Sequence, residues 1–391
     1  MMSELLESRW QETKGALLEG LQGTKKAVMA TTLENTRKYL SETATAGATS
    51  AGNVATLNRV ILPVIRRVMP TVIANELVGV QPMTGPVGQI HTLRVRYSDT
   101  VGPGASGAVA GEEALSPFKI AEAYSGDGTN APAPTASLEG SAGNRLSIQI
   151  LKQTVEAKTR KLSARWTFEA AQDAQSQHGI DVEAEIMAAL AQEITAEIDQ
   201  EVIASLNTLS GTAVQTYDQA AVSGTATFVG DEHAALAVQI NRAANLIAQR
   251  TRRGAGNWAV VSPFALTILQ SATTSAFART TEGSFEAPTN TKMVGTLNNA
   301  MKVYVNTYAA DNAPVLIGYK GSSESDAAAF YCPYIPLMSS GVVLDPGTFE
   351  PVVSFMTRYG YVELSNTASS LGNAADYLAN VAITSGNVSF S

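Results

Sequence analysis

The chain has 391 residues, of which 45% are hydrophobic and 16% charged, and its formal net charge is −8. This length allows two or three compact units that each bury a core. The charged share lies below the usual ~25%, which suits a globular protein whose surface is partly covered by something else. The acidic balance argues against a nucleic-acid coat, because neutralising phosphates requires clustered Lys and Arg.

The cysteine count and the distribution of apolar residues indicate which compartment the protein suits. A single cysteine, Cys332, excludes a disulfide framework and a cysteine-based zinc site, and it is typical of a reducing compartment. The sequence contains no run of about 18 apolar residues, so we expect no membrane span. The first residues, "MMSELLESRWQETKG", carry acids and no long apolar run, so we expect no signal peptide.

The N-terminal region is predicted to be helical over residues 3–40. Its apolar residues recur at steps of four and seven, but three glycines weaken the helix, so we expect it to need a partner surface. A linker of small residues follows, from Ser41 to Asn53. The next apolar segment, from Val54, is interrupted by Pro63 and Pro70 and should form short helical turns.

A joint rich in proline and glycine, "LVGVQPMTGPVG", leads into an extended region. After it, Val95 and Tyr97 alternate with Arg94 and Arg96, the period of a half-buried strand. A loop of small residues runs from Thr100 to Gly143. The chain then returns as a strand with its apolar side chains on one side: Leu146, Ile148 and Ile150. The two strands and the loop together predict a long, extended hairpin.

A long helix is predicted after this hairpin. One helix ends at Gly179, and Asp181 is the expected N-cap of the next, which runs for about 28 residues. Six apolar residues follow one another four positions apart, so the apolar stripe spirals around the helix and should meet different neighbours: Ile186, Leu190, Ile194, Ile198, Val202 and Leu206.

From Gly230 onwards, helices and strands alternate. A helix from Glu232 to Arg253 precedes a strand "NWAVVS", a helix "PFALTILQSAT" and strands "MKVYVNTY", "PVLIGYKG" and "AAFYCPY". This order is typical of a mixed α/β unit. A last long strand, "TFEPVVSFMTRYGYVEL", closes the pattern.

The motifs of known chemistry are weak in this sequence. "GPGASG" lacks the preceding apolar strand of a dinucleotide-binding turn and is better explained as a loop. The three histidines, His91, His178 and His233, are far apart, and surface or strand positions are the default for them. Cys332 has an apolar context and should be buried. Paired carboxylates such as Glu193 and Glu197 leave an enzyme as one hypothesis.

Charge is arranged in adjacent blocks of opposite sign. The segment from Arg145 to Arg165 holds six bases and one acid, and the segment from Trp166 to Leu209 holds nine acids and no Lys or Arg. Such blocks indicate mutual or intermolecular pairing better than catalysis, with a solvated helix face as the alternative.

Three long blocks of sequence resemble a known family. "ELVGVQPMTGPVGQIHTLRVRY", "KTRKLSARWTFEAAQDAQSQHGIDVEAEIMAALAQEITAEIDQEV" and "FYCPYIPLMSSGVVLDPGTFEPVVSFMTRYGY" resemble the major capsid proteins of T-even-type tailed bacteriophages. The resemblance implies the α+β fold of the Hong-Kong-97 type. Its parts would be an N-terminal arm (1–85), an extended hairpin loop (86–167), a peripheral domain with a spine helix (168–229), an axial domain (230–342), and a return strand with a C-terminal tail (343–391).

The same resemblance implies a structural function. The chain would form hexamers that tile a phage head around double-stranded DNA, without sequence-specific binding, cofactor, metal or membrane. Its partners would be neighbouring capsomers and vertex, portal, scaffold and decoration proteins, in a virion assembled in the host cytoplasm. A pentameric vertex protein and an encapsulin-like compartment shell are the alternatives. The expected subunit contacts are Arg94, Arg96, Arg145, Lys158, Arg160, Lys161, Glu193, Glu197, Pro82 and Gly85.

The resemblance also implies candidate sites for proteolytic cleavage of the N-terminus. Family members are often trimmed by a phage protease that cuts after a Leu/Ile-x-Glu pattern, and three triplets here match it, ending at Glu7, Glu19 and Glu42. Some members insert an extra domain in the extended-loop region. This chain is short for such a domain, and the segment from Gly102 to Gly143 would be its remnant.

Overall fold

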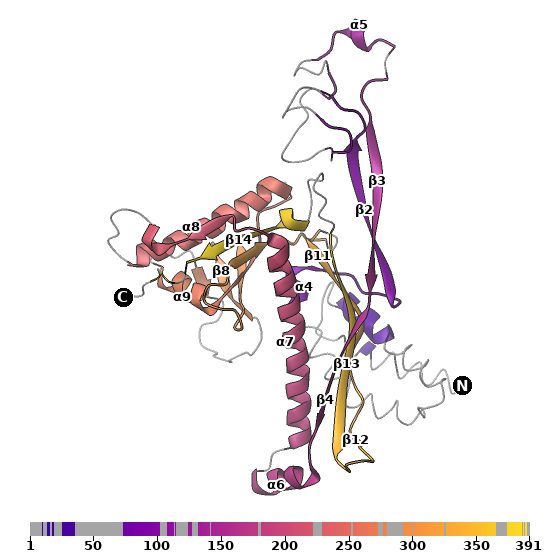
Figure 1. Ribbon diagram of the computed structural model, residues 1–391, viewed down its shortest axis with the longest axis vertical. Coiled ribbons are helices and arrows are strands. Elements are labelled where there is room, and N and C mark those ends of the chain that lie inside the picture. The colour runs from indigo at the N-terminus through magenta and orange to yellow at the C-terminus, as the bar shows by residue number, and fades with distance from the viewer. Residues whose placement is uncertain are drawn as a thin grey trace, which may run out of the picture.

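The computed structural model gives an elongated subunit (Figure 1). It describes residues 10, 14–15, 18, 26–35, 73–101, 108–112, 114, 124–126, 132–140, 142–178, 181–221, 229–251, 253–272, 277–279, 292–298, 300–323, 326–364, 374–384, 386 and 388. None of the helices within these ranges is long and apolar enough to cross a membrane.

A five-stranded sheet forms the lower part of the subunit in Figure 1. Its path runs β1 (Gly79–Val80), β11 (Ala329–Ser339), β13 (Pro351–Glu363) and β12 (Val343–Leu344), and β4 (Lys158–Arg165) pairs with β13. Only β1 lies parallel to its partner among these pairs. The long helix α7 (Val182–Ser210) runs beside this sheet, and α6 (Phe168–His178) crosses its lower end.

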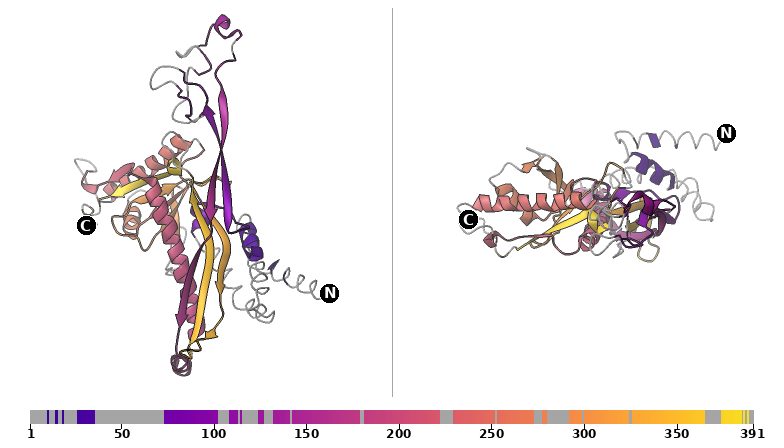
Figure 2. Two further views of the ribbon diagram at one scale, coloured as in Figure 1. Left: turned by 45° about the vertical axis from the view of Figure 1, so that its right-hand side comes forward. Right: turned by 90° about the horizontal axis from the view of Figure 1, so that it is seen from above.

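The predicted extended hairpin is present. β2 (Val87–Tyr97) and β3 (Leu146–Glu156) pair in antiparallel register from Val87–Glu156 to Tyr97–Leu146. The hairpin stands clear of the subunit body in two orientations, with the short helix α5 (Thr135–Leu138) near its far end (Figures 1 and 2). β3 leads almost directly into β4, so the hairpin grows out of the five-stranded sheet.

A seven-stranded sheet forms the second unit. Its strand order is β5 (Gln215–Tyr217), β14 (Leu378–Ile383), β10 (Val315–Gly318), β6 (Trp258–Val261), β9 (Met301–Val305), β8 (Lys292–Leu297) and β7 (Phe277–Arg279). The helices α8 (Val229–Thr251) and α9 (Pro263–Ser271) pack on it and bury an apolar face. Short 3-10 turns lie at Gln219–Ala221 and Ala374–Tyr377.

The short helix α4 (Ala74–Leu77) joins these parts. The Ile73 N–H before it donates to Asp199 Oδ1 of α7 at 2.9 Å, and the Asn75 carbonyl accepts from Lys320 Nζ at 2.8 Å. Leu77 is buried, and β1 follows in the five-stranded sheet. The joint rich in proline and glycine, "LVGVQPMTGPVG", is therefore a bend between this anchored segment and the hairpin.

The expected α+β class is confirmed, and the spiral stripe of α7 does meet different neighbours. Along its length α7 contacts β4 and β13 of one sheet and β10 and β14 of the other. Its buried residues include Leu190, Ile194, Ile198, Val202 and Leu206.

Sheet membership crosses the boundaries expected from the sequence. β11 falls within the expected axial range 230–342, yet it pairs with β13. β14 falls within the range 343–391, yet it pairs with β10 and β5 in the seven-stranded sheet. β4, expected within the extended loop 86–167, pairs with β13. Periodicity identifies strands but not their partners, so these pairings were not visible in the sequence.

The described N-terminal residues are helical. Residues 26–35 form a helix in which Val28, Met29 and Leu33 are buried, as the expected partner surface requires. Asn35 at its end donates to the Met83 carbonyl at 2.6 Å and to the Tyr334 carbonyl at 3.0 Å. The predicted linker from Ser41 to Asn53 and the segment with Pro63 and Pro70 lie outside the described residues.

Candidate functional site

The charged face of the spine helix α7 is the first part of the candidate site. Asp181 caps the helix as predicted, because its Oδ1 accepts from the N–H groups of Glu183 and Ala184 at 3.1 and 3.4 Å. Glu183 and Glu185 lie in the first turn, where carboxylates stabilise a helix. Because the apolar stripe is buried, the glutamates that alternate with it remain at the surface, whereas Asp199 is buried.

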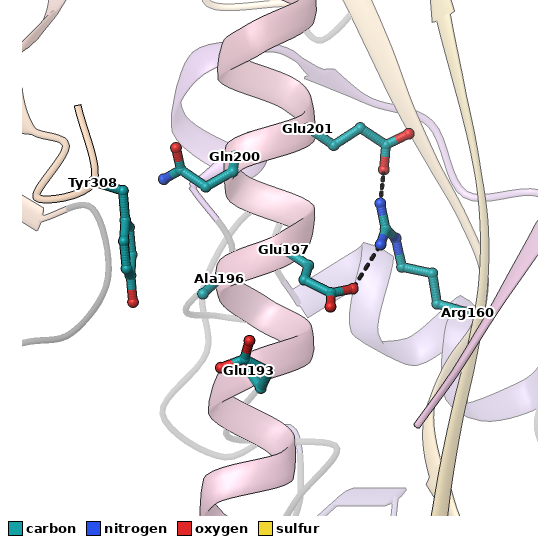
Figure 3. Close-up of a pocket in the computed structure, with 7 residues that line it drawn as sticks. All are labelled: Arg160, Glu193, Ala196, Glu197, Gln200, Glu201 and Tyr308. Carbon is teal, nitrogen blue, oxygen red and sulfur yellow. Dashed lines mark hydrogen bonds and ion pairs between the residues drawn. The ribbon is translucent and has the colours of Figure 1, made fainter. Parts of the chain in front are cut away.

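Arg160 of β4 reaches across to this face (Figure 3). Its guanidinium donates to Glu197 Oε2 at 2.7 Å, to Glu201 Oε2 at 2.6 Å and to the Tyr359 hydroxyl at 2.6 Å. The Tyr359 hydroxyl in turn donates to Glu201. The opposite charge blocks therefore pair within the subunit at this point, which is one of the arrangements that the sequence predicted.

The pKa values of this cluster follow from burial and hydrogen bonding. Burial works to raise the pKa of Glu201, but hydrogen bonds from Tyr359 and Arg160 outweigh it, and the pKa falls below its ordinary value. Burial raises the pKa of Tyr359, and its hydrogen bond to Glu201 adds to that effect. At neutral pH Arg160 and Glu201 are therefore charged and Tyr359 is neutral, so these three residues act as a fixed clasp between β4, β13 and α7.

A hollow of about 540 Å³ opens beside the clasp. Its lining is Arg160, Glu193, Ala196, Glu197, Gln200, Glu201 and Tyr308. Figure 3 shows Tyr308 on the far side of α7 from Arg160, with Glu193 one turn below Glu197. Gln200 is tied to Asn306 by hydrogen bonds of 2.8 and 3.1 Å. The hollow presents carboxylates and one exposed ring, which suits a cationic side chain from outside.

One carboxyl of α7 has a strongly raised pKa, but it does not line the hollow. A general acid and base need carboxyls whose pKa values are pushed apart at a reachable position. The carboxyl with a strongly raised pKa is Asp199, which is sealed on the other face of α7 and has 0% exposure. Within the described ranges, no group of three or more His, Cys, Asp or Glu side chains could hold a metal ion.

The basic residues of the hairpin form the second part of the site. Arg96 lies on β2, and Arg145 lies just before β3, with its N–H donating to Asp99 Oδ2 at 2.9 Å. Its guanidinium is 3.6 Å from Asp99 and its side chain is 74% exposed. Arg94 also lies on β2, but its side chain is outside the described part. Lys158 and Lys161 are exposed on β4, away from the projecting part of the hairpin.

An apolar face of the hairpin is open to solvent. Leu146, Ile148 and Ile150 lie on one side of β3, as predicted, and are 53%, 69% and 66% exposed. Val95 pairs with Ile148 and Tyr97 with Leu146, so β2 adds to the same face. Sequence periodicity placed these residues together but could not show that the subunit leaves them uncovered. We call Leu146, Ile148 and Ile150 the hairpin apolar face.

The joint before the hairpin is held from two sides. Met83 is buried with Val155 and Cys332, whereas Pro82 and Gly85 are half-buried on the outside of the bend. Burial raises the pKa of Cys332 to about 11, which confirms the predicted buried thiol. The structure therefore places Pro82 and Gly85 at the surface, where a neighbour could reach them.

The other predicted positions divide into those described and those outside. His91 is exposed on β2, as the default predicted. The prediction of a surface or strand position was wrong for His233. This residue is buried in α8, and its Nδ1 lies 2.6 Å from Ser271 Oγ. Glu7, Glu19, Glu42, Gly179 and the side chain of His178 lie outside the described residues.

Comparison with known proteins connects this geometry to a family. A profile of the family described as Major capsid protein Gp23 matches residues 54–139 and 129–383. The Major capsid protein of Vibrio phage KVP40 is 29% identical over 85% of this chain and 82% of its own length. The Major capsid protein of Enterobacteria phage T4 is 29% identical over 82% and 78%, respectively. The capsid of Myoviridae phage XM1 has a TM-score of 0.45 and 12% identity, covering 80% of this chain and 91% of that one.

Proposed function

This chain belongs to the family of major capsid protein Gp23 and is a component of a tailed-phage capsid shell; from that premise we propose that its copies associate into hexamers that tile the head around packaged DNA. The α+β fold supports this proposal, with its projecting hairpin, long helix α7 and separate seven-stranded sheet. Within this proposal the chain holds its place by contacts and performs no catalysis.

The hairpin apolar face is the observation that carries this proposal. A two-stranded ribbon has little stability by itself in water. Here a ribbon of eleven-residue strands projects from the body and exposes Leu146, Ile148 and Ile150. Burying such side chains stabilises a complex by roughly 1.5–3 kcal/mol each at most. The face therefore has a strong reason to lie on a neighbouring subunit.

Charge complementarity indicates where the hairpin would lie. The hairpin carries Arg96 and the exposed Arg145, whereas the spine helix exposes Glu193 beside an open hollow. Arg160 already binds Glu197 within the subunit, and both residues line the hollow. In this proposal Glu197 adds to its negative charge, and Arg160 bounds it on the side of β4. A basic side chain from the neighbouring hairpin would enter the hollow. Lys158 lies on the same face of β4 as Arg160, whereas Lys161 lies on the opposite face and would contact a different neighbour.

The joint and the arm would supply further contacts. Pro82 and Gly85 turn the chain at the foot of the hairpin, where small side chains permit close packing of a neighbour. The N-terminal arm would latch across adjacent subunits. Cleavage after Glu7, Glu19 or Glu42 would shorten the arm. Vertex, portal, scaffold and decoration proteins would be the partners in the virion, which would assemble in the host cytoplasm.

Electron cryo-microscopy of particles assembled from this chain tests the proposal. We expect rings of six copies in which the hairpin of one copy covers the spine helix of the next. Particles that contain the chain only at five-fold positions would instead identify a vertex protein. Shells without any contact between the hairpin and a neighbour would contradict the assigned role of the hairpin.

A further inference from the structure

A buried carboxyl joins the start of α4 to the spine helix. Asp199 of α7 has 0% exposure, and its Oδ1 accepts from the Ile73 N–H at 2.9 Å. Its Oδ2 is also buried, and this oxygen has no hydrogen-bond partner among the described residues. A carboxylate inside a protein is stable when its oxygens are paired or hydrogen-bonded. The site therefore favours a neutral carboxyl over an ionised one.

The side chain that lies near Asp199 on β11 is a neutral tyrosine. Burial raises the pKa of the Tyr331 hydroxyl, and the charge of Asp199 adds to that effect. Burial likewise raises the pKa of Asp199 to about 7, although the hydrogen bond from Ile73 lowers it. The packed carboxyl thus keeps its proton at a pH where an exposed aspartate has lost it.

Lysines of the seven-stranded sheet hold the remainder of α4. Lys302 Nζ, on β9, lies 3.5 Å from Glu76 Oε2, and Lys320 Nζ, just after β10, donates to the Asn75 carbonyl at 2.8 Å. The N–H at the start of α4 goes instead to a carboxyl that can change its charge. The attachment of α4 to α7 differs from the two lysine contacts because it depends on the protonation of Asp199.

We propose that Asp199 is a pH-sensitive latch, in which the neutral carboxyl fastens the start of α4 to the spine helix and the ionised carboxyl loosens it. Ionisation places charge on the unpaired Oδ2, and water reaches this oxygen when α4 and α7 part at Ile73. The purpose of the latch rests on the proposed shell function. Near neutral pH, a loosened attachment would let the N-terminal arm leave its own subunit and latch across a neighbour.

Hydrogen exchange at the Ile73 amide of the full, unassembled chain tests the latch. The measured quantity is the protection factor, which is the exchange rate of this amide in an unfolded chain divided by its rate in the subunit at the same pH. It should fall by up to about tenfold per pH unit from about pH 4 to about pH 7 and then level off. In this window the closed latch keeps the proton on Asp199, whereas the open form, with its ordinary pKa of 3.8, has lost it.

Low concentrations of denaturant separate local opening from global unfolding. Local opening exposes little surface, so the protection of Ile73 should hardly change with denaturant. The reference is the Met83 amide, which donates to the Pro333 carbonyl at 3.0 Å in the buried joint and should respond more strongly. Equal denaturant dependence of the two amides would show that Ile73 exchanges by global unfolding, and this result would overturn the latch.

Two variants identify the titrating group. Asp199→Asn keeps an acceptor for Ile73 and has no proton to lose, so the protection factor should no longer depend on pH. Glu185→Gln is the matched control, because Glu185 is exposed on the same helix, and it should retain the full pH dependence. Protection of Ile73 that stays constant in the unchanged chain, or that still falls with pH in Asp199→Asn, would disprove the latch. A chain that forms no shells but shows the expected exchange would contradict the proposed function and support the latch.

Discussion

Asp199 is an ionisable residue in the middle of the subunit core. Its Oδ1 accepts from the Ile73 N–H, and its Oδ2 is buried without a hydrogen-bond partner in the described part of the chain. Burial raises its pKa to about 7, with the Ile73 hydrogen bond acting in the opposite direction. The neighbouring titratable group is Tyr331 of β11, whose pKa is itself raised by burial. One carboxyl therefore links the spine helix to the arm in a manner that depends on protonation.

The stability of the unassembled subunit should fall as the pH rises from about 4 to about 7. In this window the folded state keeps the proton on Asp199 while the unfolded state, with its ordinary pKa near 3.8, has lost it. The contribution is at most about 1.4 kcal/mol per pH unit. Asp199→Asn should remove this part of the dependence and be at least as stable as the unchanged chain at pH 8. Denaturant titrations at several pH values measure both effects.

The control for this experiment is Asp199→Ala. It removes both the ionisable carboxyl and the acceptor of the buried Ile73 N–H, so it should destabilise the subunit by roughly 1–3 kcal/mol at about pH 4, and the difference from the unchanged chain should shrink as the pH rises towards 8. An Asp199→Asn variant that retains the full pH dependence would show that another group is responsible.

At the scale of elements, the foot of the hairpin packs directly against the sheet. Met83, Val155, Phe330 and Cys332 form a small core between the hairpin and β11. Gly360 of β13 faces this core without a side chain. A Cβ at residue 360 would lie 2.5 Å from Val155 Cγ2 and 3.1 Å from the Glu156 carbonyl oxygen. The close approach of β13 to β3 thus requires glycine, and it sets the position of the hairpin.

Gly360→Ala should therefore destabilise the subunit by about 1–3 kcal/mol, because the backbone carbonyl of Glu156 cannot move away as freely as a side chain. Thermal unfolding measures the loss. Gly85→Ala is the matched control, since the nearest atom to its Cβ would be the Val87 carbonyl oxygen at 3.9 Å. Equal unfolding temperatures for the two variants would argue against a tight joint at residue 360.

Sequence periodicity predicted the long elements well and their partners poorly. The spine helix and its Asp181 cap, and the strands of the hairpin, follow from local signals, which the structure confirms. Short strands such as β5, β12 and β14 were missed, because two to six residues carry little periodicity. The clasp of Arg160, Glu201 and Tyr359 joins residues up to 199 positions apart, so charge blocks could indicate pairing but not these partners.

At the scale of the whole molecule, the subunit has a well-packed body and two uncovered apolar ends. The hairpin apolar face lies at one end of the long axis, and the exposed rings of Phe168, on α6, and Phe349, before β13, lie at the other (Figures 1 and 2). Both agree with the low charged share of the sequence, which indicated a partly covered surface. A chain of this shape gains stability from its neighbours at separate points, so loss of one contact should weaken assembly without unfolding the subunit.

The central claim is that the hairpin apolar face binds a neighbouring subunit, and the double variant Ile148→Ser/Ile150→Ser tests it most directly. Both residues are exposed, so the thermal stability of the unassembled subunit should stay unchanged. In the matched control, serine replaces Val109 and Leu138. These residues are 48% and 40% exposed and lie in the segment that connects β2 to β3. Sedimentation velocity across a concentration series should show shells for the control and free subunits for the double variant. Shells from the double variant at the same concentrations as the unchanged chain would contradict the account.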